Sequence, residues 1–195
     1  HHTVSSPFST DGDISYWLSD KTKIATYIII DYNGVIHKCF PSNKWAHHIG
    51  LKSEIIKKYG FKDYNVRNEL LNKESIGIEI DSYGGIIYDS TTDKFKTVYD
   101  NVIDKKYIIK LDKPYRGFQY FFKYSDKQIQ TLSELLPILI KEYKIDKQCG
   151  LFNGEFGINM DALSGKSGIY SHSNYREDKS DLYPDERIIK MIQNL

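Results

Sequence analysis

The sequence predicts a single α/β domain. Strand-like and helix-like segments follow one another along the chain, which is the pattern of a sheet packed against helices. Residues 75–80 alternate isoleucine with small or polar residues, whereas residues 126–143 carry apolar residues at helical spacing. The length of 195 residues suits one domain with a sizeable hydrophobic core, so we expect one domain over residues 1–195.

The first part of the chain predicts a helix followed by a β-hairpin. Residues 9–13 are rich in side chains that cap a helix N-terminus, and an apolar face follows them at helical spacing. Residues 23–30 form a β-rich run, and Asn33-Gly34 is a strong hairpin signal. We therefore expect the chain to return as a second strand over residues 35–40.

The middle of the chain predicts a short helix, a strand and then little regular structure. The helix is expected over residues 53–59, where a glycine follows it. The strand over residues 75–80 carries isoleucines on one face and Glu79 on the other. Residues 89–125 are rich in tyrosine and predict an irregular segment with one short strand near residues 107–109.

The last third predicts the clearest helix and a long loop. Ser125 begins the helix, and Pro137 lies inside its apolar pattern, which predicts a kink or a break. Residues 150–168 are rich in glycine and asparagine and predict a long loop, a kind of segment that tends to be functional. Pro184 is expected to open the last helix at the first-turn position that proline favours.

Composition argues against several classes of protein. There are 27 Lys+Arg against 26 Asp+Glu, a balance that argues against a nucleic-acid partner. The longest apolar run, residues 135–140, is far shorter than the roughly 20 residues of a membrane span, and we expect no signal peptide in this chain. Cys39 and Cys149 could pair, but nothing in the sequence shows that they do.

Residues that could bind a metal gather near the two ends of the chain. His172, Lys179 and Asp181 fall within ten positions, and His1-His2 opens the chain. Two imidazoles and one carboxylate are a usual ligand set for a catalytic Zn²⁺ that keeps a fourth position open. On spacing alone, His172 and Asp181 equally fit a solvated surface loop. A histidine pair at a chain start also fits the remnant of a purification tag.

Acid–base and binding roles are open to four residues. Glu79 fits either a salt bridge or a base that takes a proton from an attacking water. Lys179 fits either an ordinary surface lysine or a group that stabilises an oxyanion. Adjacent strand residues point opposite ways, so only one of His47 and His48 can face a given cleft. In the functional interpretation His48 lines a substrate groove and Trp45 supplies an apolar wall.

The order of these segments resembles one known family. The chain runs from His1-His2-Thr3-Val4-Ser5 through residues 27–34 and residues 45–48 to Ser75-Ile76-Gly77-Ile78-Glu79 and then residues 172–181. It resembles the zinc-dependent N-acetylmuramoyl-L-alanine amidases, which include phage amidase-type endolysins and the related peptidoglycan-recognition proteins. The Ser-Ile-Gly-Ile-Glu block and the His…Lys-Ser-Asp block are the most specific parts of a match that covers essentially the whole chain.

The resemblance implies a fold, an activity and a site. The fold is an α/β domain with a mixed central β-sheet flanked by helices. The activity is hydrolysis of the amide bond between N-acetylmuramic acid and L-alanine in bacterial peptidoglycan. His1, His172 and Asp181 correspond to the Zn²⁺ ligands, while Glu79 and Lys179 correspond to the catalytic glutamate and lysine.

Two other functions stay open beside the amidase. One is a module that binds peptidoglycan without cutting it, which would have lost a ligand, and the other is a structural zinc site with four protein ligands. The resemblance also implies a secreted, cell-wall-facing or phage-encoded protein. We expect a monomer or a module of a larger lytic protein, with no stable membrane insertion.

Overall fold

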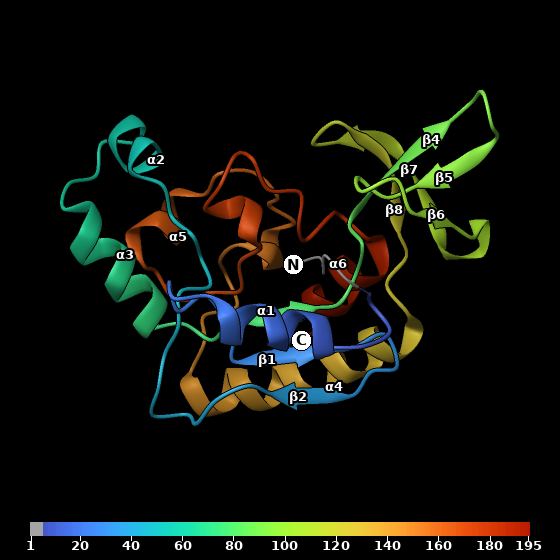
Figure 1. Cartoon of the computed structure of the whole chain (residues 1–195). Coiled ribbons are helices and arrows are strands. Elements are labelled where there is room, and N and C mark those ends of the chain that lie inside the picture. Colours follow the sequence, from blue (N-terminus) through green and yellow to red (C-terminus); the bar gives the residue numbers. More distant parts are fainter. Residues whose placement is uncertain (1–5) are drawn as a thin grey trace.

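The structure is a computed structural model that describes residues 6–195 (Figure 1). It has a mixed α/β fold, as predicted, with helices and two β-sheets. The first sheet has three strands in the order β2-β1-β3. β1 (Ile28–Ile30) pairs antiparallel with β2 (Ile36–Lys38) and parallel with β3 (Ile78–Ile80), so this sheet is mixed.

The predicted hairpin forms at Asn33-Gly34. Gly34 has a φ of +79° and donates its N–H to the Asp31 carbonyl at 2.9 Å. The Asp31 carboxylate accepts the backbone N–H groups of Asn33 and Val35, each at 2.9 Å. Both strands are shorter than the sequence predicts, because the chain before β1 leaves the hairpin and forms an isolated bridge from Ile24 to His47.

Different helices cover the two faces of the three-stranded sheet. α4 (Asp126–Tyr143) packs its apolar stripe against one face, with Leu132, Leu136 and Ile140 in the same buried cluster as Ile28, Ile30 and Ile80. Because side chains alternate along a strand, Glu79 points to the opposite face. α1 (Asp11–Ser19) lies on that side, and its Asp13 is close to Glu79 (Figure 1).

α4 begins as predicted but is not broken. Ser125 and Gln128 form a capping box, and the helix continues through Pro137 to Tyr143. Packing of the long apolar stripe stabilises the helix beyond the single hydrogen bond that proline removes. The buried Gln128 amide also donates to the carbonyls of Ile30 and Asp81, at 3.2 and 2.8 Å, and so connects α4 to two strand ends.

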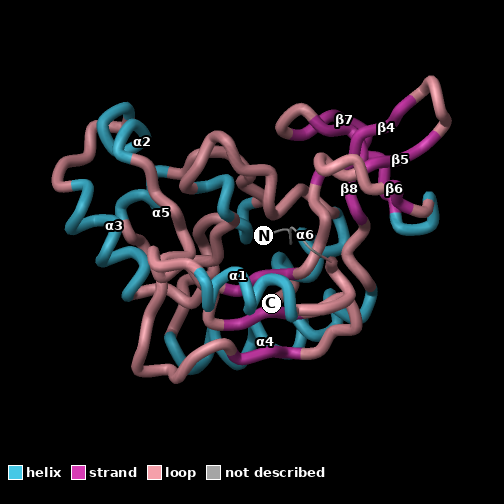
Figure 2. The backbone as a smooth tube through the Cα atoms, viewed as in Figure 1, coloured by secondary structure: helices cyan, strands magenta, loops and turns pink. Residues whose placement is uncertain are grey.

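The prediction of an irregular segment over residues 89–125 is wrong. These residues, with the strand before them, form a five-stranded antiparallel sheet of order β6-β5-β4-β8-β7. Its turns contain Asp93, Asp100 and Arg116 in the left-handed region, and an arginine there does not indicate a tight turn as glycine or aspartate does. Figure 2 shows this sheet as a separate group of strands beside the first sheet and its helices. The strands are β4 (Gly85–Asp89), β5 (Lys94–Lys96), β6 (Val102–Ile103), β7 (Ile108–Tyr115) and β8 (Phe118–Phe122).

Several smaller elements complete the fold. The last helix begins one residue after its Asp185 N-cap and not at Pro184. Within the described residues, no helix is long and apolar enough to cross a membrane. The remaining helices are α2 (Ser53–Lys58), α3 (Tyr64–Lys73), α5 (Met160–Ser164) and α6 (Glu186–Gln193), with short 3₁₀ turns η1 (Lys105–Tyr107), η2 (Leu151–Asn153) and η3 (His172–Asn174).

Candidate active site

His172 and Asp181 come together at the two ends of one loop. The His172 Nδ1 atom lies 2.9 Å from Oδ2 of Asp181, and both side chains are largely buried, with exposed fractions of 12% and 3%. The N–H of Ser173 donates to the Asp181 carbonyl at 3.2 Å and closes the loop. The local cause is η3, where Ser171 and Asn174 form a capping box.

The His172 ring is held from both sides. Its Nε2 lies 2.7 Å from the carbonyl oxygen of Ile49, while its Nδ1 faces Asp181. A neutral imidazole donates from one nitrogen only, so when Nε2–H donates to the Ile49 carbonyl, Nδ1 is left to accept from a protonated carboxyl or to bind a metal cation. A metal-binding histidine usually donates its other N–H to a backbone carbonyl, the arrangement that Ile49 supplies. This nitrogen and carboxylate pair therefore fits Zn²⁺.

The sequence places a third ligand at His1, which lies outside the described residues. Its part in the site stays a prediction.

His48 and Trp45 lie on the same cavity as the His172–Asp181 pair. The cavity has a volume of about 880 Å³. His48 is fixed by contacts of Nδ1 with the Ala46 carbonyl (3.1 Å) and of Nε2 with the Ser75 hydroxyl (2.8 Å). Burial lowers the pKa of His48 to about 4, and repulsion from other histidines adds to the shift. His48 is therefore neutral at neutral pH.

Trp45 forms part of the rim of this cavity. The side chain is 39% exposed and packs edge-on against the His47 ring, with 5.0 Å between ring centroids. The Lys73 ammonium lies 5.3 Å from the centre of the indole. An exposed aromatic face beside a cavity suits contact with a ligand, and the binding roles of Trp45 and His48 remain predictions.

Glu79 lies in a different environment from the one the sequence suggests. It is buried in β3 and is not among the residues that line the cavity. Oxygens of Asp13, Glu79 and Asp81 lie within 4.8 Å of one another, and all three residues are buried. Carboxylates packed this closely require positive charge or protons to balance them. Asp13 and Asp81 were not predicted as part of a site, although the spacing of Glu79 and Asp81 along one segment already puts them on one face.

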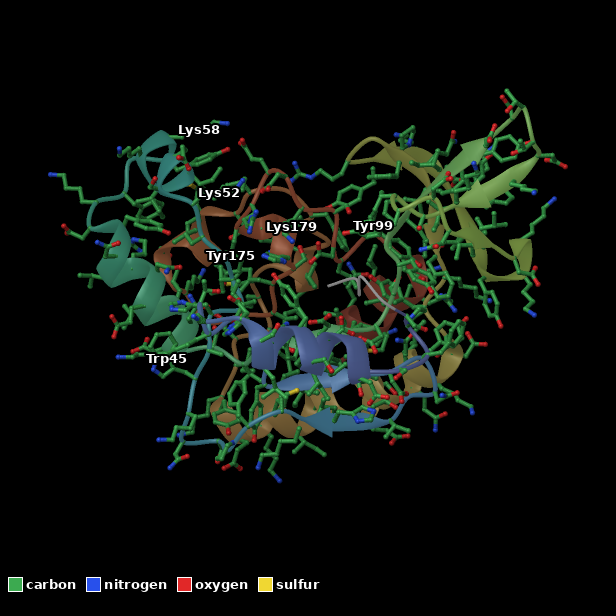
Figure 3. All side chains as sticks on the ribbon, viewed as in Figure 1. Trp45, Lys52, Lys58, Tyr99, Tyr175 and Lys179 are labelled. Atoms are coloured by element: carbon green, nitrogen blue, oxygen red, sulfur yellow. The ribbon has the colours of Figure 1, made fainter. Side chains whose placement is uncertain are left out.

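Lys179 is half-buried on the loop between η3 and Asp181 (Figure 3). The two residues before it, Glu177 and Asp178, are both held by cations. The catalytic role of Lys179, contact with a substrate oxygen, stays a prediction.

Comparison with known proteins gives one match. The model of the N-acetylmuramoyl-L-alanine amidase family (Amidase_2) matches residues 1–184. No curated protein and no solved structure gives a significant match. Members of this family act on peptidoglycan and typically depend on zinc. Because the match covers nearly the whole sequence, and the paired His172 and Asp181 suit such a metal, this chain belongs to the N-acetylmuramoyl-L-alanine amidase family.

Proposed function

We propose that this protein is a zinc-dependent N-acetylmuramoyl-L-alanine amidase whose catalytic domain spans residues 1–195. It hydrolyses the amide bond between N-acetylmuramic acid and the L-alanine of the stem peptide. The observation that carries this proposal is the His172 ring, which faces one oxygen with each nitrogen inside a family that typically uses zinc. His172 and Asp181 bind Zn²⁺ together with His1.

The metal supplies one part of the chemistry. Bound Zn²⁺ would polarise the scissile carbonyl and acidify the attacking water. The chain prepares this position through the Ile49 carbonyl, which orients the His172 ring, and through the closed loop that sets Asp181 beside it.

Glu79 and Lys179 supply proton transfer and charge stabilisation. Glu79 accepts a proton from the water as the water oxygen bonds to the carbonyl carbon. It then gives that proton to the L-alanine nitrogen as the C–N bond breaks. The Lys179 ammonium stabilises the negative charge that develops on the carbonyl oxygen, a contribution of about 3–4 kcal/mol for a donor of this kind.

His48 and Trp45 shape the substrate cleft. Both nitrogens of His48 already contact protein oxygens, so this ring serves as a fixed wall and not as a proton carrier. Trp45 presents an exposed apolar face to a peptidoglycan strand. We expect the substrate to be a muramyl peptide of a bacterial cell wall, consistent with a secreted or phage-encoded lytic enzyme.

One observation favours a second function, binding of peptidoglycan without hydrolysis. Glu79 is buried with two other carboxylates and is not among the residues that line the cavity. A pure binding module would retain the cleft walls and the metal pair but would lack a working base.

Purified cell walls and zinc-loaded protein separate the two functions. An amidase releases stem peptides with a new L-alanine amino terminus, detected by mass spectrometry, and Glu79→Ala should slow this release by about 10²- to 10⁴-fold. Glu54→Ala, which removes an exposed carboxylate on α2, is the matched control and should leave the rate unchanged. The amidase proposal would be refuted if zinc-loaded protein with an intact N-terminus sediments with the walls but releases no peptide.

A further inference from the structure

Two carboxylates stand directly before Lys179, and each is occupied by cations. Asp178 receives two hydrogen bonds from the Arg176 guanidinium: Nε to Oδ1 at 3.0 Å and Nη2 to Oδ2 at 2.7 Å. The Lys52 ammonium also contacts Oδ2, at 2.9 Å. Asp178 therefore faces two positive charges from two different segments of the chain.

Glu177 is held in the same way. Its Oε1 contacts the Lys58 ammonium and accepts the Tyr59 hydroxyl at 3.2 Å. Its backbone carbonyl accepts Nη1 of Arg116, at the β7–β8 turn, at 2.7 Å. Figure 3 shows Lys52 and Lys58 on the α2 side of the loop that carries Lys179. The loop is thus bound from both sides.

Both carboxylates stay ionised because of these contacts. Hydrogen bonds from Arg176 hold the pKa of Asp178 well below its usual range, and the hydrogen bond from Lys58 lowers the pKa of Glu177. An ionised carboxylate attracts any nearby cation, and Lys179 is the adjacent one in sequence. Among residues 6–195, however, Lys179 forms no ion pair and no hydrogen bond.

The lack of a side chain at Gly50 leaves room for the Arg176 guanidinium. Gly50 has a φ of +60°, and a Cβ built there would lie 2.6 Å from Nη1 of Arg176. The same short segment supplies the Ile49 carbonyl to His172 and the Lys52 ammonium to Asp178. One stretch of chain, residues 49–52, therefore contacts the loop at three points, at His172, Arg176 and Asp178.

We propose that Lys52, Lys58 and Arg176 are positioning residues that keep the carboxylates of Glu177 and Asp178 away from Lys179. The ammonium of Lys179 then remains available to the substrate oxygen. This inference rests on the proposed role of Lys179. Exposed ion pairs contribute little to stability, and Lys52 and Asp178 are 46% and 48% exposed, so loss of the Lys52–Asp178 pair should act on Lys179 more than on the fold.

The test releases Asp178 and then removes its charge. The double variant Lys52→Met with Arg176→Met should lower kcat for stem-peptide release by about fivefold, the strength of one exposed ion pair, with KM unchanged. Adding Asp178→Asn should restore kcat to within about twofold of the parent protein, because no charge is then left to capture Lys179. A second double variant, Lys52→Met with Arg176→Lys, keeps one cation beside Asp178 and should retain most of the parent rate.

Removal of a charge from α2, the helix that begins directly after Lys52, provides the control. Lys57→Met takes an exposed ammonium from α2 and should leave kcat unchanged. Unfolding midpoints of all variants, measured in parallel, distinguish a loss of activity from a loss of stability.

A crystal structure of the double variant gives a reading that does not depend on activity. Lys179 Nζ should lie within about 4 Å of an Asp178 or Glu177 carboxylate oxygen. If that pair does not form, or if Asp178→Asn fails to restore the rate, the cations only brace the loop and the inference is overturned. If the parent protein is active and Lys179→Ala is equally active, the proposed role of Lys179 fails instead.

Discussion

Gly77→Ala should damage both the fold and the substrate cleft, because a methyl group at this position collides with His48. A Cβ at Gly77 would lie 2.7 Å from Cγ of the His48 ring, against 3.4 Å or more for an ordinary contact. The backbone has no freedom to retreat, since the Gly77 carbonyl accepts the N–H groups of Tyr27 and Ile28 at 3.0 and 3.1 Å. The ring must therefore move by about 0.7 Å.

The size of the effect follows from that displacement. Overpacking of a buried position costs about 1–3 kcal/mol. In a chain of this length each kcal/mol lowers the unfolding midpoint by about 2–4 °C. The same movement can lengthen the 2.8 Å contact between His48 Nε2 and the Ser75 hydroxyl by up to about 0.7 Å and so weaken it. Loss of an oriented cleft wall should raise KM for a muramyl peptide by about tenfold.

Thermal unfolding and steady-state kinetics measure these two effects. Gly157→Ala is the matched control, because a Cβ there meets nothing within 4 Å. In a His48→Ala background Gly77→Ala should cost much less, since the colliding ring is gone, and the two changes should be clearly non-additive. Unchanged stability and KM in Gly77→Ala, or full additivity with His48→Ala, would refute the geometry described for this contact.

Three further predictions concern pH, the core and the metal. Burial lowers the pKa of His48 to about 4 from 6.5, so as the pH falls the unfolded chain takes up this proton before the folded chain does. The stability that neutral His48 contributes should therefore be lost as the pH falls from about 6.5 towards 4. Urea unfolding across that range should show this slope in the parent protein and a reduced slope in His48→Gln. Gln128→Ala should cost about 2–4 kcal/mol in urea unfolding, because it removes the side-chain donor to the buried Asp81 carbonyl and the side-chain acceptor of the Ser125 N–H, and opens a cavity. Equilibrium dialysis with zinc should show one tightly bound ion per chain, and His172→Ala should abolish this tight binding. If the ion instead binds at the cluster of Asp13, Glu79 and Asp81, His172→Ala will still bind it tightly.

Local signals in the sequence predicted the parts of the fold that local interactions determine. Asn33-Gly34 predicted the hairpin, and Ser125 with the apolar stripe predicted α4. α3 was missed because its N-cap, Asp63, adopts a left-handed conformation with no side-chain cap. The second sheet was missed because four of its five strands have five residues or fewer, and because Arg116 adopts the left-handed conformation at the turn between β7 and β8.

The candidate site divides in the same way. The His172–Asp181 pairing was predicted from one short segment, and the structure brings these two side chains together. The groups that orient them come from distant positions, such as the Ile49 carbonyl, 123 residues from His172. The acidic cluster around Glu79 depends on Asp13, which only the packing of α1 brings close. Contacts of this range leave no local pattern in a single sequence.

Anomalous diffraction at the zinc edge, from crystals of zinc-loaded protein, tests the central claim most directly. The predicted result is one peak bonded to Nδ1 of His172 and to the Asp181 carboxylate, with His1 as the third protein ligand. The site at Asp13, Glu79 and Asp81 should carry no peak. A peak at that acidic cluster instead, or no peak beside His172, would contradict the proposed active site.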